Sequence, residues 1–367
     1  MSSSQHVVLS HAELRLMMRD CFLGAGLDET DAEAVADVLA DANLRGVESH
    51  GVERAPIYMR RLRQGLATGT NGAAVTVEAG AICRMDAGRA LGPAVSVLAL
   101  DRAVALAREH GMGLVAVGRS THFGAAGYYA RRAAAQGMIA MVASNAAASM
   151  APHGGSEPFL GANPLAIGAP LGRHGQFVLD MSTSVAARGR IRRAHALGEP
   201  VPEGLAIDAD GVPTTDPLAA MAGSMLPVGG AKGSGLALAI TLLTGMLAAA
   251  DFDDEIDSMY GDAERPQNIG HLFWVVDPAV MGPPEEAEAR VEQMIDRLHG
   301  VRTAPGVDGV IHPGERQDRV ARQRAATGIP VARIEIERLA EAASECGLES
   351  LAQDILAAAG GAAQPAR

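Results

Sequence analysis

The chain has 367 residues, of which 48% are hydrophobic and 20% charged, a composition typical of a globular protein with a sizeable core. Acidic residues outnumber basic ones by 43 to 31, and no long basic run occurs, which excludes nucleic acid and anionic membrane as favoured partners. The three cysteines are far apart and lack CxxC spacing, so a disulfide framework and a thiolate metal site are disfavoured. No secretory signal is visible, and we expect a cytoplasmic protein.

The two ends of the chain are predicted to be helical. Apolar residues recur at helical spacing in residues 10–25 and 29–44, and a third helix passes through Tyr58 and stops at Gly65. Near the other end, residues 316–325 and 334–346 are predicted helices, and the tail from Ala357 is expected to fray. We therefore expect a helical lobe formed by residues 1–70 and joined by residues 300–367.

Residues 71–299 have a different pattern and predict a central α/β domain. Helices are expected at 92–109, 124–136 and 287–298, and strands at 74–78, 81–86, 114–117, 139–143, 177–180 and 273–276. Residues 200–219 and 305–314 should be loops. The apolar run 233–250 is near the lower length of a membrane span, but it stands alone and contains Ser and Thr, so we interpret it as a buried helix.

Ser49, His50 and Arg54 lie within six positions between two predicted helices. His50 and Arg54 are four residues apart, a spacing that places side chains on one helix face, with Ser49 at a capping position. A histidine exchanges a proton near neutral pH, and an arginine holds a carboxylate by two parallel hydrogen bonds. This combination suits chemistry at a carbon next to a carboxylate. The alternative is a capped surface helix whose polar side chains meet water.

The usual nucleotide-binding fingerprints are missing. The nearest match to GxGxxG, at Gly111 and Gly113, precedes its strand instead of following it, so it cannot hold a pyrophosphate at a helix start. GGAKGSG has glycine after the lysine where a P-loop needs a hydroxyl. His153, His271 and His312 are not spaced as metal ligands, and we predict no metal.

The segment after the strand at 114–117 is the better candidate for cofactor contact. There His122 precedes a run of small residues that opens a helix, and backbone N–H groups at a helix start favour phosphate. A tight turn with a hydrogen-bonded His122 is the alternative. The Gly- and Pro-rich residues 151–170 predict a fixed loop beside a pocket or a plain surface connection. Asp180 and Ser182 lie at a strand end, where they can contact a ligand or simply cap the next turn. Lys232 precedes the apolar helix, where its cation can meet phosphate or carboxylate, the alternative being a solvated lysine beside a flexible turn.

Seven segments together make the chain similar to a known family. RGVESHGVER, STHFGAAGYYA, APHGGSEPFLGANPLAIGAP, DMSTS, DGVPTTDP, LPVGGAKGSGLAL and HPGERQDRVARQRAATGIP occur in order between residues 45 and 330. The chain resembles the malate/L-lactate dehydrogenase family that lacks a Rossmann domain, which also contains ureidoglycolate and sulfolactate dehydrogenases and reductases of cyclic imino acids. The resemblance implies a non-Rossmann α/β fold of the sulfolactate dehydrogenase type, with a mixed sheet covered by helices, and usually a homodimer.

The resemblance also implies hydride transfer between NADH or NADPH and a small 2-oxo acid. By this analogy His50 and Ser49 belong to a proton relay, and Arg54 binds the substrate carboxylate. His122 competes with His50 for the proton-transfer role, His122 being favoured in a hydroxy-acid dehydrogenase and His50 in an imine reductase. The implied cofactor contacts are His122, Phe123, Gly124, Ala125, Ala126, Asp180, Met181, Ser182, Lys232, Gly233, Pro313, Gly314, Glu315 and Arg316.

The sequence departs from the family pattern at three positions. Ala162 stands where Thr is frequent, Arg190 where Lys is frequent, and Ser234 where Tyr is common. None of these decides between three hypotheses: a 2-hydroxy-acid dehydrogenase, a reductase of a cyclic 2-imino acid such as piperideine- or pyrroline-2-carboxylate, and a catalytically silent ligand-binding relative.

Overall fold

A seven-stranded mixed sheet forms the centre of the computed structural model, which describes residues 6–260 and 265–361. Its strand order is β2-β3-β4-β11-β5-β6-β7, and each neighbouring pair is antiparallel except β3 with β4. The strands are β2 (Ala74–Ala79), β3 (Ile82–Asp86), β4 (Met112–Ser120), β5 (Ile139–Ser144), β6 (Leu165–Pro170), β7 (Gln176–Met181) and β11 (Ile269–Val276). A Rossmann sheet is mostly parallel, so the expected non-Rossmann α/β fold is confirmed.

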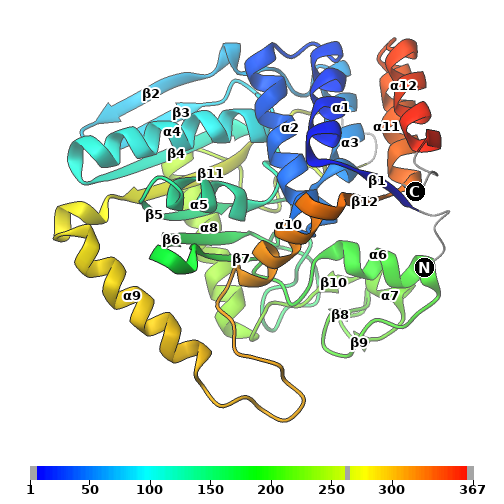
Figure 1. The fold of residues 1–367 in the computed structure, drawn as a ribbon. Helices are drawn as coiled ribbons and strands as arrows, with labels where there is room; N and C mark the ends of the chain where they lie inside the picture. Colours follow the sequence, from blue (N-terminus) through cyan, green and yellow to red (C-terminus); the bar gives the residue numbers. More distant parts are fainter. Residues whose placement is uncertain (1–5, 261–264, 362–367) are drawn as a thin grey trace, which may run out of the picture.

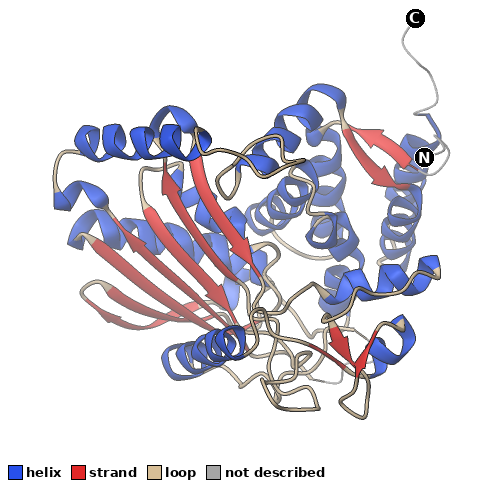
Figure 2. Ribbon diagram, turned by 90° about the horizontal axis from the view of Figure 1, so that it is seen from below, coloured by secondary structure: helices blue, strands red, loops and turns tan. Residues whose placement is uncertain are grey.

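Helices cover both faces of this sheet (Figures 1 and 2). Strand β11 shows the division, because successive side chains on a strand point to opposite faces. Phe273 and Val275 pack with α4 (Gly92–His110) and α5 (Ala126–Ala134), whereas Leu272 packs with α8 (Ala231–Ala248). The Ala-rich helices allow close approach, and Gly168 on β6 lies so near the Ala130 carbonyl that a Cβ would come within 2.2 Å of its oxygen.

The two ends of the chain share one hydrophobic cluster beside the sheet. It joins α1 (His11–Gly24), α2 (Glu29–Leu44) and α3 (Ala55–Arg63) to α11 (Arg333–Glu345) and α12 (Glu349–Gly361). Strand β1 (His6–Leu9) pairs with β12 (Ile329–Ala332) in a separate two-stranded sheet. A capping box between Ser10 and Glu13 fixes the start of α1, and Asp28 caps α2.

A small unit extends from the carboxyl end of β7. It contains α6 (Arg188–Leu197), α7 (Pro217–Ala222) and a three-stranded sheet of β8 (Ala206–Ile207), β9 (Pro213–Thr214) and β10 (Ser224–Met225). Helices α9 (Pro284–His299) and α10 (Glu315–Thr327) follow β11 and lead back to the terminal helices (Figure 1). Short 3-10 turns occupy Glu48–His50 (η1), Val52–Arg54 (η2), Thr70–Gly72 (η3), Gly172–His174 (η4) and Pro278–Met281 (η5).

Several local expectations were wrong. Strand β6 lies inside the predicted loop 151–170, β8 and β9 lie inside the predicted loop 200–219, and α7 begins within that loop. Helix α12 continues to Gly361, where fraying from Ala357 was expected, because its apolar face packs into the terminal cluster. Short strands and helices of this kind are fixed by tertiary contacts that composition does not report.

The rest of the loop before β6 is held by a buried polar network. The Asn163 side-chain amide donates hydrogen bonds to the Ala237 carbonyl (3.1 Å), the Thr241 hydroxyl (2.9 Å) and the Asp253 carboxylate (2.7 Å). The same Asp253 oxygen accepts the Gly161 N–H at 2.7 Å. The expected fixed loop is therefore fastened to α8 and to the segment that follows α8.

The interpretation of residues 233–250 as a buried helix was also wrong. Helix α8 is long and apolar enough to cross a membrane by length and composition, and only 33% of it is buried in this chain. Its inner side meets the sheet through Ile240 and Ala248, and Ala237 packs into a separate cluster with the small unit. Its outer side exposes large apolar side chains: Leu238, Leu242, Leu243, Met246 and Leu247.

Candidate functional site

Ser49, His50 and Arg54 lie on two consecutive 3-10 turns, η1 and η2, directly before α3. The expectation of one α-helix with Ser49 as its cap was wrong, since the α-helix begins at Ala55. The Ser49 hydroxyl instead lies 2.9 Å from His50 Nδ1. Asn43 fixes these turns by accepting the Val52 N–H at 2.7 Å, and it lies so close to Gly51 that a Cβ there would clash.

His122 follows β4 and lies against the same group. Its ring stacks on that of His50 with centroids 5.6 Å apart, and the Tyr58 hydroxyl is 2.6 Å from His122 Nδ1. Tyr58 comes one helical turn after Arg54, so α3 presents both side chains on one face. The terminal lobe and the central sheet thus each supply one of the two histidines.

The hydrogen bonds of His122 define its tautomer. The Gly124 backbone N–H donates to Nδ1 at 3.3 Å, so this nitrogen is an acceptor and the Tyr58 hydroxyl also donates to it. The proton of the neutral ring is therefore on Nε2, which makes no hydrogen bond within the described residues. This arrangement leaves an N–H for an oxygen or nitrogen atom of a ligand.

Both histidines are held neutral at physiological pH. Burial, together with the nearby Arg54 cation, lowers the pKa of His50 to about 4. Burial also lowers the pKa of His122 well below its ordinary value, and His50, Arg54 and His271 add to the effect. Burial raises the pKa of Tyr58 above its ordinary value, so this residue remains a hydroxyl donor.

Arg54 is only 7% exposed and is held from two sides. Its Nε donates to the Ser49 carbonyl at 2.6 Å, and one terminal nitrogen donates to the Tyr260 hydroxyl. Tyr260 also carries the Arg192 guanidinium over its ring, 4.8 Å from the centroid. Because Tyr260 is exposed, a substrate carboxylate can displace its hydroxyl from the terminal nitrogen of Arg54.

The predicted cofactor segments converge on the carboxyl end of β7. The Asp180 carboxylate accepts the Gly127 N–H at 2.9 Å, and the Val178 N–H donates to the Pro313 carbonyl at 3.1 Å. Ala125, Gly127, Asp180 and Gly314 line one narrow crevice between α2, α5 and α10. Gly314 has φ +96°, and a Cβ there would come within 3.0 Å of the β7 backbone.

Asp180 changes the interpretation of the predicted phosphate site. Helix α5 has no side-chain cap of its own, and the Asp180 carboxylate fills this role from β7. Burial raises the pKa of Asp180, although the Gly127 N–H and the Arg131 cation oppose this change. One of the N–H groups at this helix start is therefore already bonded within the chain.

The remaining predicted contacts have different surroundings. Phe123 is buried and stacks on His271, whereas Lys232 and Arg316 are exposed. Ser182 bonds Ser184 within its own turn, and the Thr183 carbonyl accepts the Val228 N–H at 2.9 Å, which brings the start of α8 toward the end of β7. Glu315 points into a histidine cluster beside α9. The other predicted cofactor contacts are Gly124, Ala126, Met181 and Gly233. Gly233 packs so closely against Val228 that a Cβ would clash.

Sequence analysis missed Tyr58 and Tyr260 as members of this site. Tyr58 was detectable, because it is four residues after Arg54 and the helix was predicted. Tyr260 belongs to the segment between α8 and β11, and no local pattern connects it with Arg54, 206 positions away.

Comparison with known proteins gives consistent results. Residues 9–340 match the family described as malate/L-lactate dehydrogenase. The chain is 40% identical over 301 residues to the (2R)-3-sulfolactate dehydrogenase (NADP(+)) of Chromohalobacter salexigens, covering 82% of this chain and 87% of that protein. It resembles the solved sulfolactate dehydrogenase of Methanocaldococcus jannaschii with a TM-score of 0.87 and 35% identity, covering 95% and 99% of the two chains. It also resembles the delta1-piperideine-2-carboxylate reductase of Pseudomonas syringae, with a TM-score of 0.83, 31% identity and coverage of 91% and 99%.

The neutral His122 tautomer is a testable property of the free protein. We expect nitrogen-15 correlation spectra at pH 7 to show His122 protonated at Nε2 only, because Nδ1 accepts two hydrogen bonds. Its titration should fall well below pH 6.5. In Tyr58→Phe, which removes one donor to Nδ1, turnover should fall about five- to tenfold, the effect of one hydrogen bond. A proton on Nδ1 would contradict the assignment.

Proposed function

Because the chain belongs to the malate/L-lactate dehydrogenase family, we propose that it interconverts a small 2-oxo acid and the corresponding 2-hydroxy acid with NADH or NADPH. The observation that carries this proposal is the proximity of a buried guanidinium, Arg54, to two neutral imidazoles, His50 and His122. A reducible carbonyl beside a carboxylate needs a cation for the carboxylate and a polar N–H for the carbonyl oxygen.

The proposed division of labour follows the two parts of the chain. Residues 1–70 and 300–367 form the substrate lobe, with Ser49, His50, Arg54 and Tyr58, and residues 71–299 form the cofactor domain. Segments His122–Ala126, Asp180–Ser182, Lys232–Gly233 and Pro313–Arg316 contact the cofactor. Asp180 has a different role from the other residues of these segments, since its side chain bonds the Gly127 N–H and so positions α5.

The chemistry assigned to the residues follows from their hydrogen bonds. The bound nicotinamide supplies or accepts the hydride at the 2-carbon. Arg54 orients the carboxylate after exchanging Tyr260 for it, and His122 Nε2–H donates a hydrogen bond to the 2-oxo oxygen. For proton transfer to the developing alkoxide, His122 first takes a proton from solvent at Nδ1, so that loss of the Nε2 proton leaves a neutral imidazole. When His122 is protonated on both nitrogens, the Tyr58 hydroxyl turns to accept from Nδ1. The Ser49 hydroxyl, 2.9 Å from His50 Nδ1, holds the His50 ring, and this ring stacks on His122 and supports it.

A cyclic 2-imino acid is the second candidate substrate. It shares the carboxylate that Arg54 would bind, and its protonated nitrogen carries the positive charge that a neutral His50 tolerates. The piperideine-2-carboxylate reductase with a similar fold gives this alternative a precedent in the family. In that case Ser49 and His50 become the proton-transfer pair.

A spectrophotometric screen tests the function directly. NADH and NADPH would each be combined with pyruvate, oxaloacetate, sulfopyruvate and piperideine-2-carboxylate, following the absorbance of the reduced nicotinamide. We expect turnover of at least one open-chain 2-oxo acid. Preference for the cyclic imine would move the assignment to the second candidate, and binding of NADPH without turnover of any of these compounds would support the silent relative.

Arg54 is expected to dominate substrate binding. In Arg54→Ala, kcat/KM should fall by about two orders of magnitude or more, since a charge-assisted bidentate pair contributes roughly 3 kcal/mol. KM should rise while cofactor affinity, measured by quenching of reduced-nicotinamide fluorescence, stays within a factor of about two. Arg60→Ala, at an exposed position of the same helix, is the control. Equal kinetics in the two variants would remove Arg54 from the substrate site.

We also propose that the chain forms a homodimer through the outer side of α8. Leu238, Leu242 and Met246 recur at four-residue spacing, and Leu243 and Leu247 continue the same stripe. Met246 is 77% exposed, and no charged residue lies between Gly233 and Ala250. A two-fold dimer buries one patch against its own copy, so a second copy of this chain covers the stripe without a further partner.

The free thiols of Cys21, Cys83 and Cys346 fit the proposed cytoplasmic location.

A charge on the stripe should dissociate the dimer. Light scattering after size exclusion should give twice the chain mass for the wild type and the chain mass for Leu242→Glu, because a buried unpaired carboxylate is costly. Leu218→Glu, at an exposed leucine on α7, should remain dimeric. A wild-type monomer, or a Leu242→Glu dimer, would contradict the placement of the interface.

A further inference from the structure

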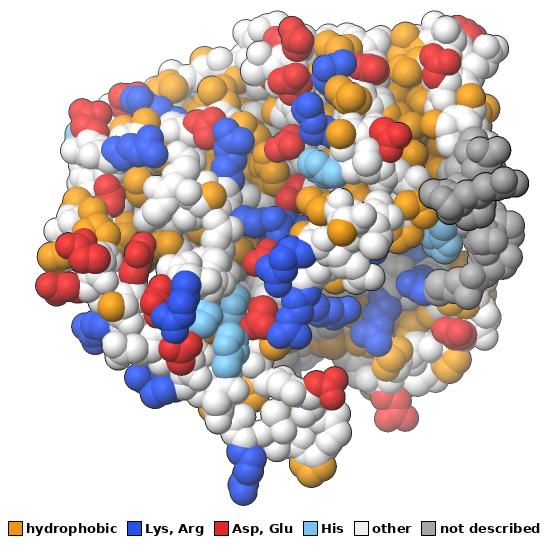
Figure 3. All heavy atoms as spheres, viewed as in Figure 1, with side chains coloured by type: hydrophobic (Ala, Val, Ile, Leu, Met, Phe, Trp, Pro, Cys, Tyr) orange, Lys and Arg blue, Asp and Glu red, His pale blue; other side chains and the backbone are white. Residues whose placement is uncertain are grey.

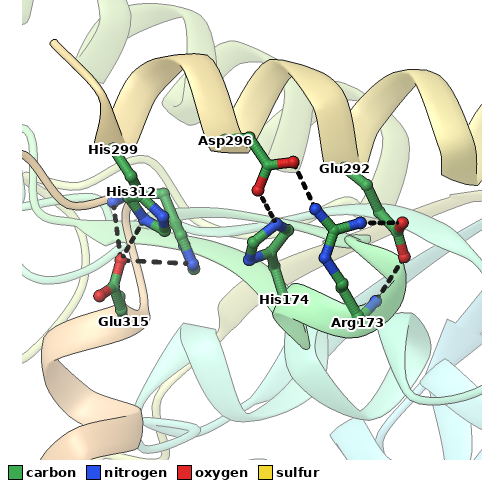
Figure 4. Close-up of polar contacts among 7 residues, drawn as sticks. All are labelled: Arg173, His174, Glu292, Asp296, His299, His312 and Glu315. Carbon is green, nitrogen blue, oxygen red and sulfur yellow. Dashed lines mark hydrogen bonds and ion pairs between the residues drawn. The ribbon is translucent and has the colours of Figure 1, made fainter.

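Three potential metal ligands meet where α9 ends and α10 begins (Figure 4). His299 is the last residue of α9, Glu315 is the first of α10, and His312 ends the intervening loop. One ligand atom from each lies within 4.8 Å of the others. Figure 3 shows histidines grouped with acidic and basic side chains on this face.

The hydrogen bonds leave one nitrogen of His312 facing a carboxylate. Its Nδ1 is 3.0 Å from the Pro313 carbonyl, which can only accept, so Nδ1 carries a proton. Nε2 is therefore the nitrogen available to a metal ion, and it lies 3.6 Å from Glu315 Oε2. His312 is only 4% exposed, so these two atoms face each other inside the protein. A cation between them would be bound by both.

The two carboxylate oxygens of Glu315 have different partners. Arg319 bonds Oε1, while His299 Nε2 lies 3.0 Å from Oε2. Oε2 is therefore the atom that both imidazoles approach.

We propose that His299, His312 and Glu315 form a binding site for a divalent transition-metal ion, of which Zn²⁺ fits best. Two imidazoles and one carboxylate are a common Zn²⁺ ligand set with a fourth position for water. With bonds of about 2.0–2.1 Å, tetrahedral ligand atoms lie about 3.4 Å apart. The observed 3.0 Å and 3.6 Å separations from Glu315 Oε2 bracket this value. The Nδ1–H bond of His312 to Pro313 is the support that orients a metal-binding imidazole.

Neighbouring contacts hold the end of α9 in place for this role. Asp296 lies 3.0 Å from His174 Nε2 and also pairs with Arg173, which reaches Glu292 as well. These pairs fasten α9 to η4, the turn between β6 and β7 (Figure 4). The His174 ring meets that of His299 edge to face at 5.6 Å. His299 is thus held in place before a metal arrives.

A metal here would close the loop of residues 300–311, which lies between His299 and His312. The loop is largely exposed and has no helix or strand, so metal binding restrains it at both ends. His312 directly precedes Pro313 and Gly314, whose backbone contacts β7. An effect of the metal on the cofactor segment Pro313–Arg316 rests on the proposed function, whereas the metal site itself does not. The proposal departs from our sequence-based prediction of no metal.

Zn²⁺ titration of tag-free, chelator-treated protein tests the site. Calorimetry at pH 7.5 should show one Zn²⁺ per chain in the wild type, and affinity should fall at least about tenfold in His299→Gln. His299→Gln is the principal variant because its side chain is partly exposed and outside the cofactor and substrate sites. His195→Gln, at an exposed histidine of α6, is the matched control and should bind as the wild type does.

Protection of the loop gives a second readout that does not depend on activity. Zn²⁺ should slow trypsin cleavage after Arg302 in the wild type and in His195→Gln, but not in His299→Gln. Substoichiometric binding in the wild type, or equal affinity in all three proteins, would overturn the proposal. Binding at one site without protection of Arg302 would retain the metal site and reject the restraint of the loop.

Discussion

The hydrogen bond between Tyr58 and His122 joins the terminal lobe to the central sheet at the point where the chemistry is placed. Tyr58 comes from α3 and His122 from the turn after β4, so either part alone leaves the site incomplete. The Gly124 N–H, which donates to the same nitrogen, sets the tautomer, and the Tyr58 hydroxyl is the second donor. Packing of the terminal helices into one cluster therefore places the second hydrogen-bond donor of His122.

The parts of the fold that the sequence predicted are those with long regular patterns. Helices α1, α2, α4 and α9 and strand β4 have clear apolar periodicity, and the structure places them close to the expected residues. The pairing of β1 with β12 joins residues 6–9 to 329–332, and no local pattern reports such a contact. The family resemblance was confirmed because it rested on many separated motifs, which survive errors in single elements.

The site shows the same limit at the scale of side chains. Spacing correctly suggested that Arg54 and His50 are neighbours, yet the helix invoked for them is a pair of 3-10 turns. Tyr260 and the His299–His312–Glu315 cluster are built from segments that spacing rules treat as unrelated. The apolar run in α8 was interpreted as core because composition reports hydrophobicity but not which side of a helix faces the rest of the chain.

Asp180 explains how this fold differs from a glycine-rich phosphate loop. In such a loop the helix start is left open for the ligand, whereas here a carboxylate of the same chain occupies one N–H of α5. A second anion at that N–H would meet Asp180 directly, so under the proposed function the cofactor phosphate would be held by the neighbouring crevice walls of Ala125 and Gly314 or by the exposed cations Lys232 and Arg316. A cofactor held by several separated segments requires each of them to be positioned independently. The contacts of Asp180 with α5 and of Pro313 with β7 provide that positioning.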